Sequence, residues 1–225
     1  MTEPDFLRRT RASYDATADD YAGWIRTELA AKPLDRAVLA GFAELVTGPV
    51  ADIGCGAGRM TAHLDGLGVP VFGIDLSPRV VEVARRAYPG LRFEVGSMLA
   101  LDLEDASLGG VLAWYSIIHV PDPELPAVFA EFQRVLAPGG YLQLAFQVGD
   151  APLHLTNAGG HEVSLDFHRR QPDRVAGLLG AAGFVERARM VRAPDEDSAF
   201  PERTPQAFLL ARKPPAGQDA AGRHP

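Results

Sequence analysis

Apolar positions follow two different patterns along the chain, and the change comes near residue 49. Between residues 14 and 29, aromatic and aliphatic residues recur three or four positions apart, which builds one apolar face of a helix. A second helix is predicted over 34–45, because Pro33 stands at a position that favours a helix start. From residue 49 on, short apolar runs alternate with helix-like segments. These runs cover residues 49–53, 69–74, 91–95, 110–115 and 141–146.

This alternation predicts an α/β fold, because short apolar strands separated by helices are typical of a parallel sheet covered on both faces. Ser77-Pro78 and Asp122-Pro123 mark two helix starts, each with a capping side chain before a proline. A helix over 172–182 and a closing hairpin of two strands follow. We expect a helical cap over 1–46, a doubly wound sheet domain over 47–213 with a flap at about 147–170, and a disordered tail over 214–225.

Composition and charge narrow the function classes. The 225 residues include 22 Lys and Arg against 29 Asp and Glu, a net charge of −7, whereas proteins that bind nucleic-acid phosphates usually carry a basic surplus. A single cysteine cannot form an internal disulfide, which fits a reducing compartment. The polar N-terminus lacks the apolar core of a signal peptide, and no apolar run is long enough to span a bilayer. We therefore expect a cytoplasmic enzyme or ligand binder with neither nucleic acid nor membrane as partner.

The segment VADIGCGAGR, residues 50–59, combines a strand, a glycine-rich turn and a helix start. Glycines at 54, 56 and 58 let the backbone turn sharply and let a ligand come close. The Gly-Lys-Ser/Thr end of a triphosphate-binding loop is missing, and the G-x-G-x-G spacing differs from the G-x-G-x-x-G of a dinucleotide fingerprint. Asp52 lies just before the turn, where its carboxylate is expected to repel a diphosphate and attract an ammonium group. At ~4 Å and a dielectric constant of ~20, each effect is about 4 kcal/mol.

A second carboxylate, Asp75, ends the next predicted strand in the segment FGIDLSP. The carboxyl ends of parallel strands meet at one edge of a sheet, and an acidic side chain about twenty residues after the loop can accept both ribose hydroxyls. The ligand described by these residues carries a ribose, is cationic at one end and lacks a diphosphate.

The segments VADIGCGAGRM, FGIDLSP, GSM and VLAPGGYLQLAF, in this order and spacing, resemble class I S-adenosylmethionine-dependent methyltransferases over about residues 46–146. The resemblance implies a seven-stranded sheet with one antiparallel strand, and S-adenosylmethionine as the cofactor. It also implies that the loop over 54–58 backs the methionine part while Asp75 holds the ribose. The segment 113–120 is similar to one that passes near the sulfonium and the substrate, and the N-terminal helices resemble a lid.

One position departs from this family, because many members carry Asp where this chain has Ser97. The hydroxyl of Ser97 is expected to bind the adenine amino group more weakly, while the Met98 thioether packs on the ring. Cys55 is interpreted as a small buried residue rather than a nucleophile. The residues expected to contact the cofactor are Tyr14, Tyr21, Asp52, Gly54, Cys55, Gly56, Asp75, Leu76, Ser97, Met98, Tyr115 and Ser116.

His119 is the candidate for proton transfer, since it follows the fourth predicted strand and an imidazole titrates near neutrality. The alternative is a histidine that caps the next helix or packs beneath the cofactor. His154, His161 and His168 recur every seven residues, which is not a chelating spacing, so we expect no metal and interpret their segment as a substrate flap. Arg169 and Arg170 are interpreted as solvated, with contact to an anionic substrate as the alternative.

Together these patterns predict an enzyme that moves a methyl group from S-adenosylmethionine to an O or N of a small molecule, working as a monomer or homodimer. Two alternatives stay open. One is a nicotinamide-dependent oxidoreductase on a similar sheet, and the other is a non-catalytic protein that binds S-adenosylmethionine.

Overall fold

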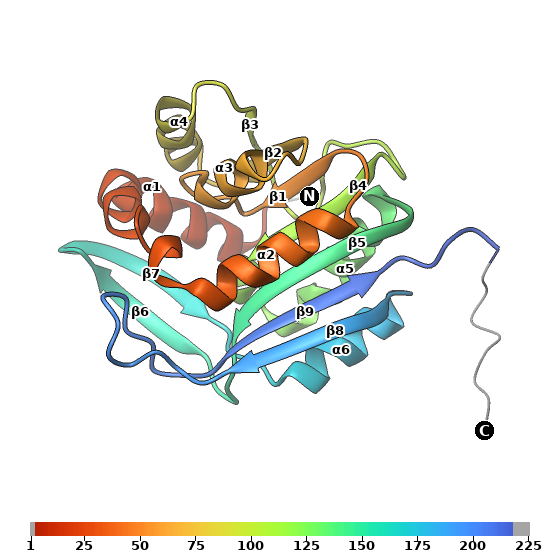
Figure 1. Ribbon diagram of the computed structural model, residues 1–225. Coiled ribbons are helices and arrows are strands. Elements are labelled where there is room, and N and C mark those ends of the chain that lie inside the picture. The colour runs from red at the N-terminus through yellow and green to blue at the C-terminus, as the bar shows by residue number, and fades with distance from the viewer. Residues whose placement is uncertain (1–2, 218–225) are drawn as a thin grey trace.

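Seven strands form one twisted sheet in the computed structural model, which describes residues 3–217 (Figure 1). The strand order is β3-β2-β1-β4-β5-β9-β8, and β9 alone runs antiparallel to its neighbours. This confirms the predicted doubly wound, mostly parallel sheet with one antiparallel strand. The strands are β1 (Val50–Ile53), β2 (Val71–Asp75), β3 (Phe93–Val95), β4 (Leu108–Trp114), β5 (Leu136–Gln147), β8 (Val185–Arg192) and β9 (Gln206–Arg212).

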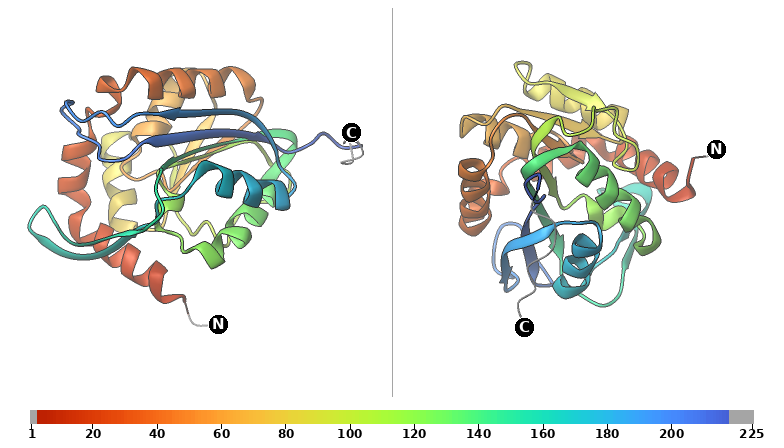
Figure 2. Two further views of the ribbon diagram at one scale, coloured as in Figure 1. Left: turned by 90° about the horizontal axis from the view of Figure 1, so that it is seen from below. Right: turned by 90° about the vertical axis from the view of Figure 1, so that its right-hand side faces the viewer.

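Helices cover both faces of this sheet, as Figure 2 shows. Phe42 of α2 and Leu64 of α3 are buried with Leu112 on one face, whereas Phe132 of α5 and Leu179 of α6 are buried on the other. The helices are α1 (Asp5–Ile25), α2 (Pro33–Leu45), α3 (Arg59–Gly66), α4 (Pro78–Ala87), α5 (Leu125–Val135) and α6 (Pro172–Ala181). None of these described helices combines the length and the apolar character needed to cross a membrane.

The strand order reverses between β1 and β4, which lie side by side although they belong to different halves of the sheet. In open α/β sheets a ligand crevice opens where the order reverses, outside the carboxyl ends of the strands. The glycine loop follows β1 at this edge, and residues 115–119 follow β4. Both candidate segments therefore come together by topology.

Two elements cover this edge of the sheet. The first is helix α1, which packs against α4 and against the second element, a two-stranded hairpin. The hairpin consists of β6 (Leu153–Ala158) and β7 (His161–Phe167), joined by two glycines with positive φ angles. It occupies the segment interpreted from the sequence as a flap.

The structure corrects two details of the predicted helices. The first helix starts at Asp5 and ends at Ile25, so the apolar pattern expected to continue to residue 29 runs into a separate 3₁₀ turn, and Trp24 is 61% exposed. Asp122 does not cap α5, because its carboxylate pairs with Arg170 instead. Of the tail expected over 214–225, residues 218–225 lie outside the described residues.

Candidate active site

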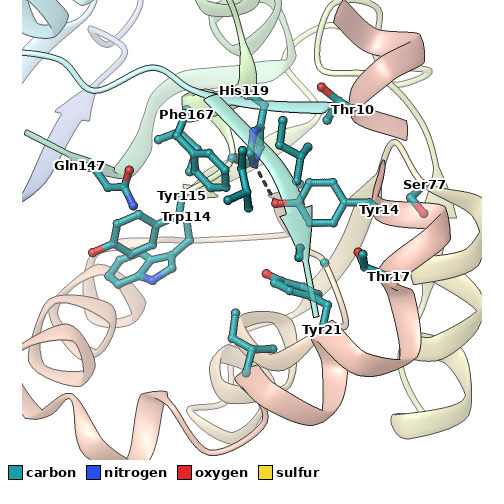
Figure 3. Close-up of a pocket in the computed structure, with 18 of the residues that line it drawn as sticks. Thr10, Tyr14, Thr17, Tyr21, Ser77, Trp114, Tyr115, His119, Gln147 and Phe167 are labelled. Atoms are coloured by element: carbon teal, nitrogen blue, oxygen red, sulfur yellow. Dashed lines mark hydrogen bonds between the residues drawn. The ribbon is translucent and has the colours of Figure 1, made fainter. Parts of the chain in front are cut away.

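A cavity of about 770 Å³ lies between α1, the hairpin and the carboxyl ends of β1, β2 and β4 (Figure 3). This volume is within the range of small-molecule sites. Most of the site residues expected from the sequence line it. They are Tyr14, Tyr21, Gly54, Gly56, Asp75, Leu76, Ser97, Met98, Tyr115, Ser116 and His119.

The glycine loop can form only because position 54 has no side chain. Gly54 has φ +76°, and a Cβ atom there would lie 2.3 Å from the Cβ atom of Ser116. Ser116 in turn is held by its hydroxyl, which donates a hydrogen bond of 2.7 Å to the carbonyl oxygen of Ile53. The serine hydroxyl thus joins the end of β1 to the segment after β4, and this hydrogen bond has a structural role.

The Asp75 carboxylate is oriented by two backbone groups at the cavity wall. The N–H of Gly56 donates to Oδ2 at 2.8 Å, and the N–H of Ser77 donates to Oδ1 at 2.9 Å. Burial raises the pKa of Asp75, and these two backbone donors oppose the increase. A carboxylate oxygen has more than one acceptor site, so each can also accept a hydroxyl proton from a ligand. The geometry suits a pair of adjacent hydroxyls.

Asp52 lies beneath the glycine loop rather than in the cavity, which corrects the expectation that it meets an ammonium group. Its side chain is buried, and Oδ2 accepts a hydrogen bond of 2.7 Å from the hydroxyl of Thr61 on α3. Burial raises the pKa of Asp52 to about 7. The side chain therefore connects β1 to the helix after the loop, and any effect on a ligand passes through the loop backbone.

Cys55 also points away from the cavity, although it belongs to the loop. Its side chain packs with Phe93 and Val81 beneath α4, and burial raises the pKa of its thiol well above the ordinary value. A buried thiol that stays protonated is a poor nucleophile, which supports the interpretation of Cys55 as a small packing residue.

Tyr14 and His119 form a hydrogen-bonded pair inside the cavity, drawn as the dashed line in Figure 3. The Tyr14 hydroxyl lies 2.8 Å from Nε2 of His119, and Nδ1 lies 2.9 Å from the carbonyl oxygen of Asp166. A carbonyl only accepts, so Nδ1 of the neutral ring carries the proton and Nε2 accepts from the tyrosine. Burial lowers the pKa of His119 to about 4, which keeps the ring neutral at physiological pH.

Charged residues that the sequence analysis did not single out hold the cap over the cavity. Arg59, at the start of α3, pairs with Glu28 at 2.7 Å, and both line the cavity. The buried Lys32 binds Asp195 at 3.0 Å and Glu202 at 3.2 Å, which fastens the loop between β8 and β9 to the cap. No local sequence signal marks these pairs, because each joins distant segments.

The histidines of the hairpin bind carboxylates instead of gathering around a metal. His154 lies 2.7 Å from Asp166, and His161 lies 2.7 Å from Asp20 of α1, which ties the hairpin tip to the cap. Within residues 3–217, no three His, Cys, Asp or Glu side chains come together in a possible metal site.

The pKa shifts of Asp52 and His119 predict opposite effects on stability between about pH 4 and pH 7. Below pH 6.5 the unfolded chain binds a proton on His119 that the folded chain takes up only near pH 4. Through His119, the free energy of unfolding therefore decreases as the pH falls. Asp52 releases its proton above about pH 4 in the unfolded chain but only near pH 7 in the folded chain. Through Asp52, the free energy of unfolding therefore decreases as the pH rises.

Asp52→Asn is therefore expected to make the free energy of unfolding rise more steeply with pH than in the parent protein, and His119→Asn is expected to make it rise less or fall. Each slope changes by up to about 1.4 kcal/mol per pH unit. Urea unfolding of the three proteins across this pH window measures the slopes. Parallel pH profiles for all three would contradict the assigned shifts.

Comparisons with known proteins identify the central part of the chain. Residues 50–140 match a family model described as a methyltransferase domain. The O-methyltransferase cnsE of Penicillium expansum is 36% identical over 110 residues, which are 46% of this chain and 39% of that protein. An O-methyltransferase of Pyrenophora dematioidea is 32% identical over 144 residues, 60% of this chain and 53% of that protein. The chain thus matches about half or less of the length of these curated relatives.

A solved structure shows the same fold over nearly the whole chain. The crystal structure of Burkholderia thailandensis 1,6-didemethyltoxoflavin-N1-methyltransferase, with bound 1,6-didemethyltoxoflavin and S-adenosylhomocysteine, is similar with a TM-score of 0.72 and 22% identity. The match covers 95% of this chain and 92% of that one. The matched domain and both relatives are methyltransferases by name, and the fold is the one seen in this methyltransferase with bound S-adenosylhomocysteine.

Proposed function

We propose that the protein transfers a methyl group from S-adenosylmethionine to an oxygen or nitrogen atom of a small-molecule acceptor. The observation that supports this most strongly is one cavity shared by the glycine loop, the Asp75 carboxylate and the largely apolar walls beyond them. The O-methyltransferase names of the relatives support an oxygen acceptor, and the N1-methyltransferase name of the structural neighbour supports a nitrogen acceptor.

The residues of the cavity fit this cofactor. Asp75, held by two backbone N–H groups, can accept both ribose hydroxyls, and Ser97 and Met98 line the wall where the adenine would lie. Gly56 faces Tyr21, and a Cβ atom there would stand 3.5 Å from the ring, so the loop backbone and the tyrosine border the same part of the cavity, where the methionine part would lie. S-adenosylmethionine supplies an electrophilic methyl group for an in-line displacement when it is bound.

The Tyr14–His119 pair is suited to take the proton of the acceptor. The tyrosine donates its own proton to Nε2 of His119, so the lone pairs of its oxygen are available to the cavity. In this proposal the acceptor gives its proton to the Tyr14 oxygen while the tyrosine proton moves to Nε2. The neutral imidazole can receive it, and the carbonyl of Asp166 stabilises the imidazolium until it loses the proton to water.

Tyr14→Phe and His119→Gln are each expected to lower kcat about a hundredfold, with little change in S-adenosylhomocysteine affinity. General-base catalysis contributes roughly 10²–10⁴-fold, and the low pKa of His119 favours the smaller effect. Steady-state kinetics with an acceptor that the parent protein methylates, and calorimetry with S-adenosylhomocysteine, measure the two quantities. His63→Gln, outside the cavity on α3, is the matched control. A parent-like kcat in both cavity variants would remove the pair from the mechanism.

Calorimetry and a methyl-transfer screen test the function as a whole. We expect the protein to bind S-adenosylmethionine and S-adenosylhomocysteine but not NAD, and to transfer a labelled methyl group to some of a panel of phenols and amines. Tight binding of NAD without binding of S-adenosylhomocysteine would favour the oxidoreductase alternative. Cofactor binding without transfer to any phenol, amine, RNA or protein would favour the non-catalytic alternative.

The wider proposal concerns organisation and partners. We propose that residues 1–46 act as a lid, that residues 147–170 act as a flap over the acceptor, and that 47–213 form the catalytic domain. The net charge of −7 argues against nucleic acid as a partner. A monomer or homodimer in the cytoplasm, without a membrane partner, agrees with the composition and with the buried, unpaired cysteine.

A further inference from the structure

We call the side of the cavity lined by Trp114, Tyr115, Phe167 and Gln147 the acceptor half, and the side of the glycine loop and Asp75 the cofactor half. The acceptor half contains a partly buried cation that no carboxylate among residues 3–217 neutralises. Arg169 lines the cavity, and its Nε atom is buried without a hydrogen-bond partner. Among residues 3–217, no carboxylate lies within ion-pair distance of this guanidinium. By contrast, Arg11 and Arg59 line the cofactor half and are paired with Glu3 and Glu28, although Nη1 of Arg59 has no hydrogen-bond partner among the described residues. In a protein of net charge −7, an unpaired arginine at this place points to an anionic ligand.

The backbone fixes the position of Arg169. The N–H of the preceding residue, His168, donates to the carbonyl of Ile118 at 2.7 Å, and the N–H of Arg170 donates to the carbonyl of Gln147 at 3.0 Å. Residue 169 is therefore held between the segment after β4 and the end of β5. These are the strand ends where substrates of this fold are bound.

A glycine makes room for the arginine side chain. The Arg169 stem crosses Gly149, where an added Cβ atom would lie 3.0 Å from the Arg169 Cβ and 3.1 Å from its Cδ. These contacts are tighter than ordinary van der Waals contact, so an alanine at position 149 would shift the arginine stem by a few tenths of an ångström. The adjacent Arg170 is different, because it is buried and donates to Asp122 and to three backbone carbonyls.

The surroundings of Arg169 indicate what the rest of the ligand resembles. Phe167, Trp114 and Tyr115 line the same half of the cavity and offer aromatic surfaces (Figure 3). Gln147 ends β5 beside these aromatic side chains, and its Oε1 atom is buried without a hydrogen-bond partner among the described residues. Tyr115 has φ +52°, a conformation that is costly for a bulky residue and is found mainly where function requires it. Aromatic walls with one cation and one amide fit a planar ring that carries a negative group.

We propose that the acceptor is an aromatic molecule bearing a carboxylate, and that Arg169 binds this carboxylate. The inference rests on the proposed methyltransferase function and concerns the acceptor, since the cofactor carboxylate would meet the paired arginines of the other half. Gln147 accepts a hydrogen bond from a hydroxyl or amino group on the ring. Arg169 is thereby a specificity-determining residue. By holding the carboxylate at one end of the acceptor, it directs the atom to be methylated toward the cofactor.

Calorimetry of the protein saturated with S-adenosylhomocysteine tests this assignment. The probes are 4-hydroxybenzoate, salicylate and 3-hydroxy-2-naphthoate, each compared with its neutral carboxamide of nearly the same shape. We expect at least one acid to bind about tenfold or more tightly than its amide, and Arg169→Gln to abolish that preference. A hydrogen bond to a charged group changes affinity by roughly tenfold to a hundredfold.

Two further variants separate this role from a merely structural one. Gly149→Ala keeps the charge but shifts the arginine stem, so it should lower acid affinity more than amide affinity. Arg203→Gln alters an exposed arginine at the rim of the cavity and should change neither. Binding of S-adenosylhomocysteine must stay parent-like in all three variants, which also reports folding.

The possible contrary results are distinct. If no acid binds more tightly than its amide, or if Arg169→Gln keeps the preference, the assignment of the anionic acceptor fails while the cofactor site stands. If Arg169→Gln weakens S-adenosylhomocysteine as strongly as the acids, the arginine serves the cofactor and the inference is overturned. If the parent protein binds no S-adenosylhomocysteine, it is the proposed function itself that fails.

Discussion

Replacing Asp75 with alanine is expected to weaken binding of S-adenosylhomocysteine at least a hundredfold. The carboxylate is placed to accept two ribose hydroxyls, and a hydrogen bond to a charged group contributes about 1.5–3 kcal/mol. The substitution also removes the acceptor for the Gly56 and Ser77 N–H groups, so the glycine loop loses the side chain that orients it. Isothermal titration calorimetry with S-adenosylhomocysteine measures the change.

Two comparison variants keep the Asp75 prediction specific. Asp75→Asn preserves size but places an amide NH₂ where one of the backbone donors points, so it should also lose most of the affinity. Asp65→Ala removes an exposed carboxylate from α3 and should bind like the parent protein. Thermal unfolding of each variant reports whether the fold is intact. A folded Asp75→Ala protein with parent-like affinity would exclude this carboxylate from the cofactor site.

Gly54→Ala is expected to destabilise the protein by about 3 kcal/mol and to abolish cofactor binding. The added Cβ atom would lie 2.3 Å from the Ser116 Cβ, so β1 and the segment after β4 must separate. Overpacking costs about 1–3 kcal/mol, and the φ angle of +76° adds strain that alanine tolerates poorly. Urea unfolding and calorimetry with S-adenosylhomocysteine measure the two effects.

The clash itself can be tested by removing the other atom. Ser116→Gly combined with Gly54→Ala should recover part of the lost stability, since the second Cβ atom is then absent. Gly41→Ala is the matched control: this glycine lies in α2 with nothing within 4 Å of an added Cβ, and alanine there should stabilise by about 0.5–1 kcal/mol. If the double variant is no more stable than Gly54→Ala alone, the contact with Ser116 is not the cause.

The sheet and the glycine loop could be predicted because their signals are local. Apolar runs of strand length, separated by helices, are enough to indicate a parallel sheet, and the observed order confirms it. Asp75 could be placed as well, since a residue at the carboxyl end of β2 must lie at the same edge as the loop after β1.

Side-chain direction at the site was harder to predict. Asp52 stands two residues before Gly54, yet its carboxylate turns beneath the loop to Thr61, because the strand pleat and the helix after the loop decide where it points. Tyr14 was expected at the cofactor and His119 in proton transfer, but their hydrogen bond spans 105 positions of sequence and has no local signature. The same holds for the contacts of Lys32 with the loop before β9.

The amino-acid sequence by itself determined the α/β class, the glycine turn at 54–58 and the carboxylate at the end of the second strand. These follow from periodicity, from the conformations open to glycine and from strand ends, all of which act over a few neighbouring residues. Only the tertiary structure decided which charges meet: Arg170 pairs with Asp122, while Arg169 lines the cavity with no carboxylate partner among residues 3–217. Two adjacent arginines are alike in sequence, and only their surroundings, built from distant segments, distinguish the buried, paired Arg170 from the Arg169 that we propose binds the acceptor.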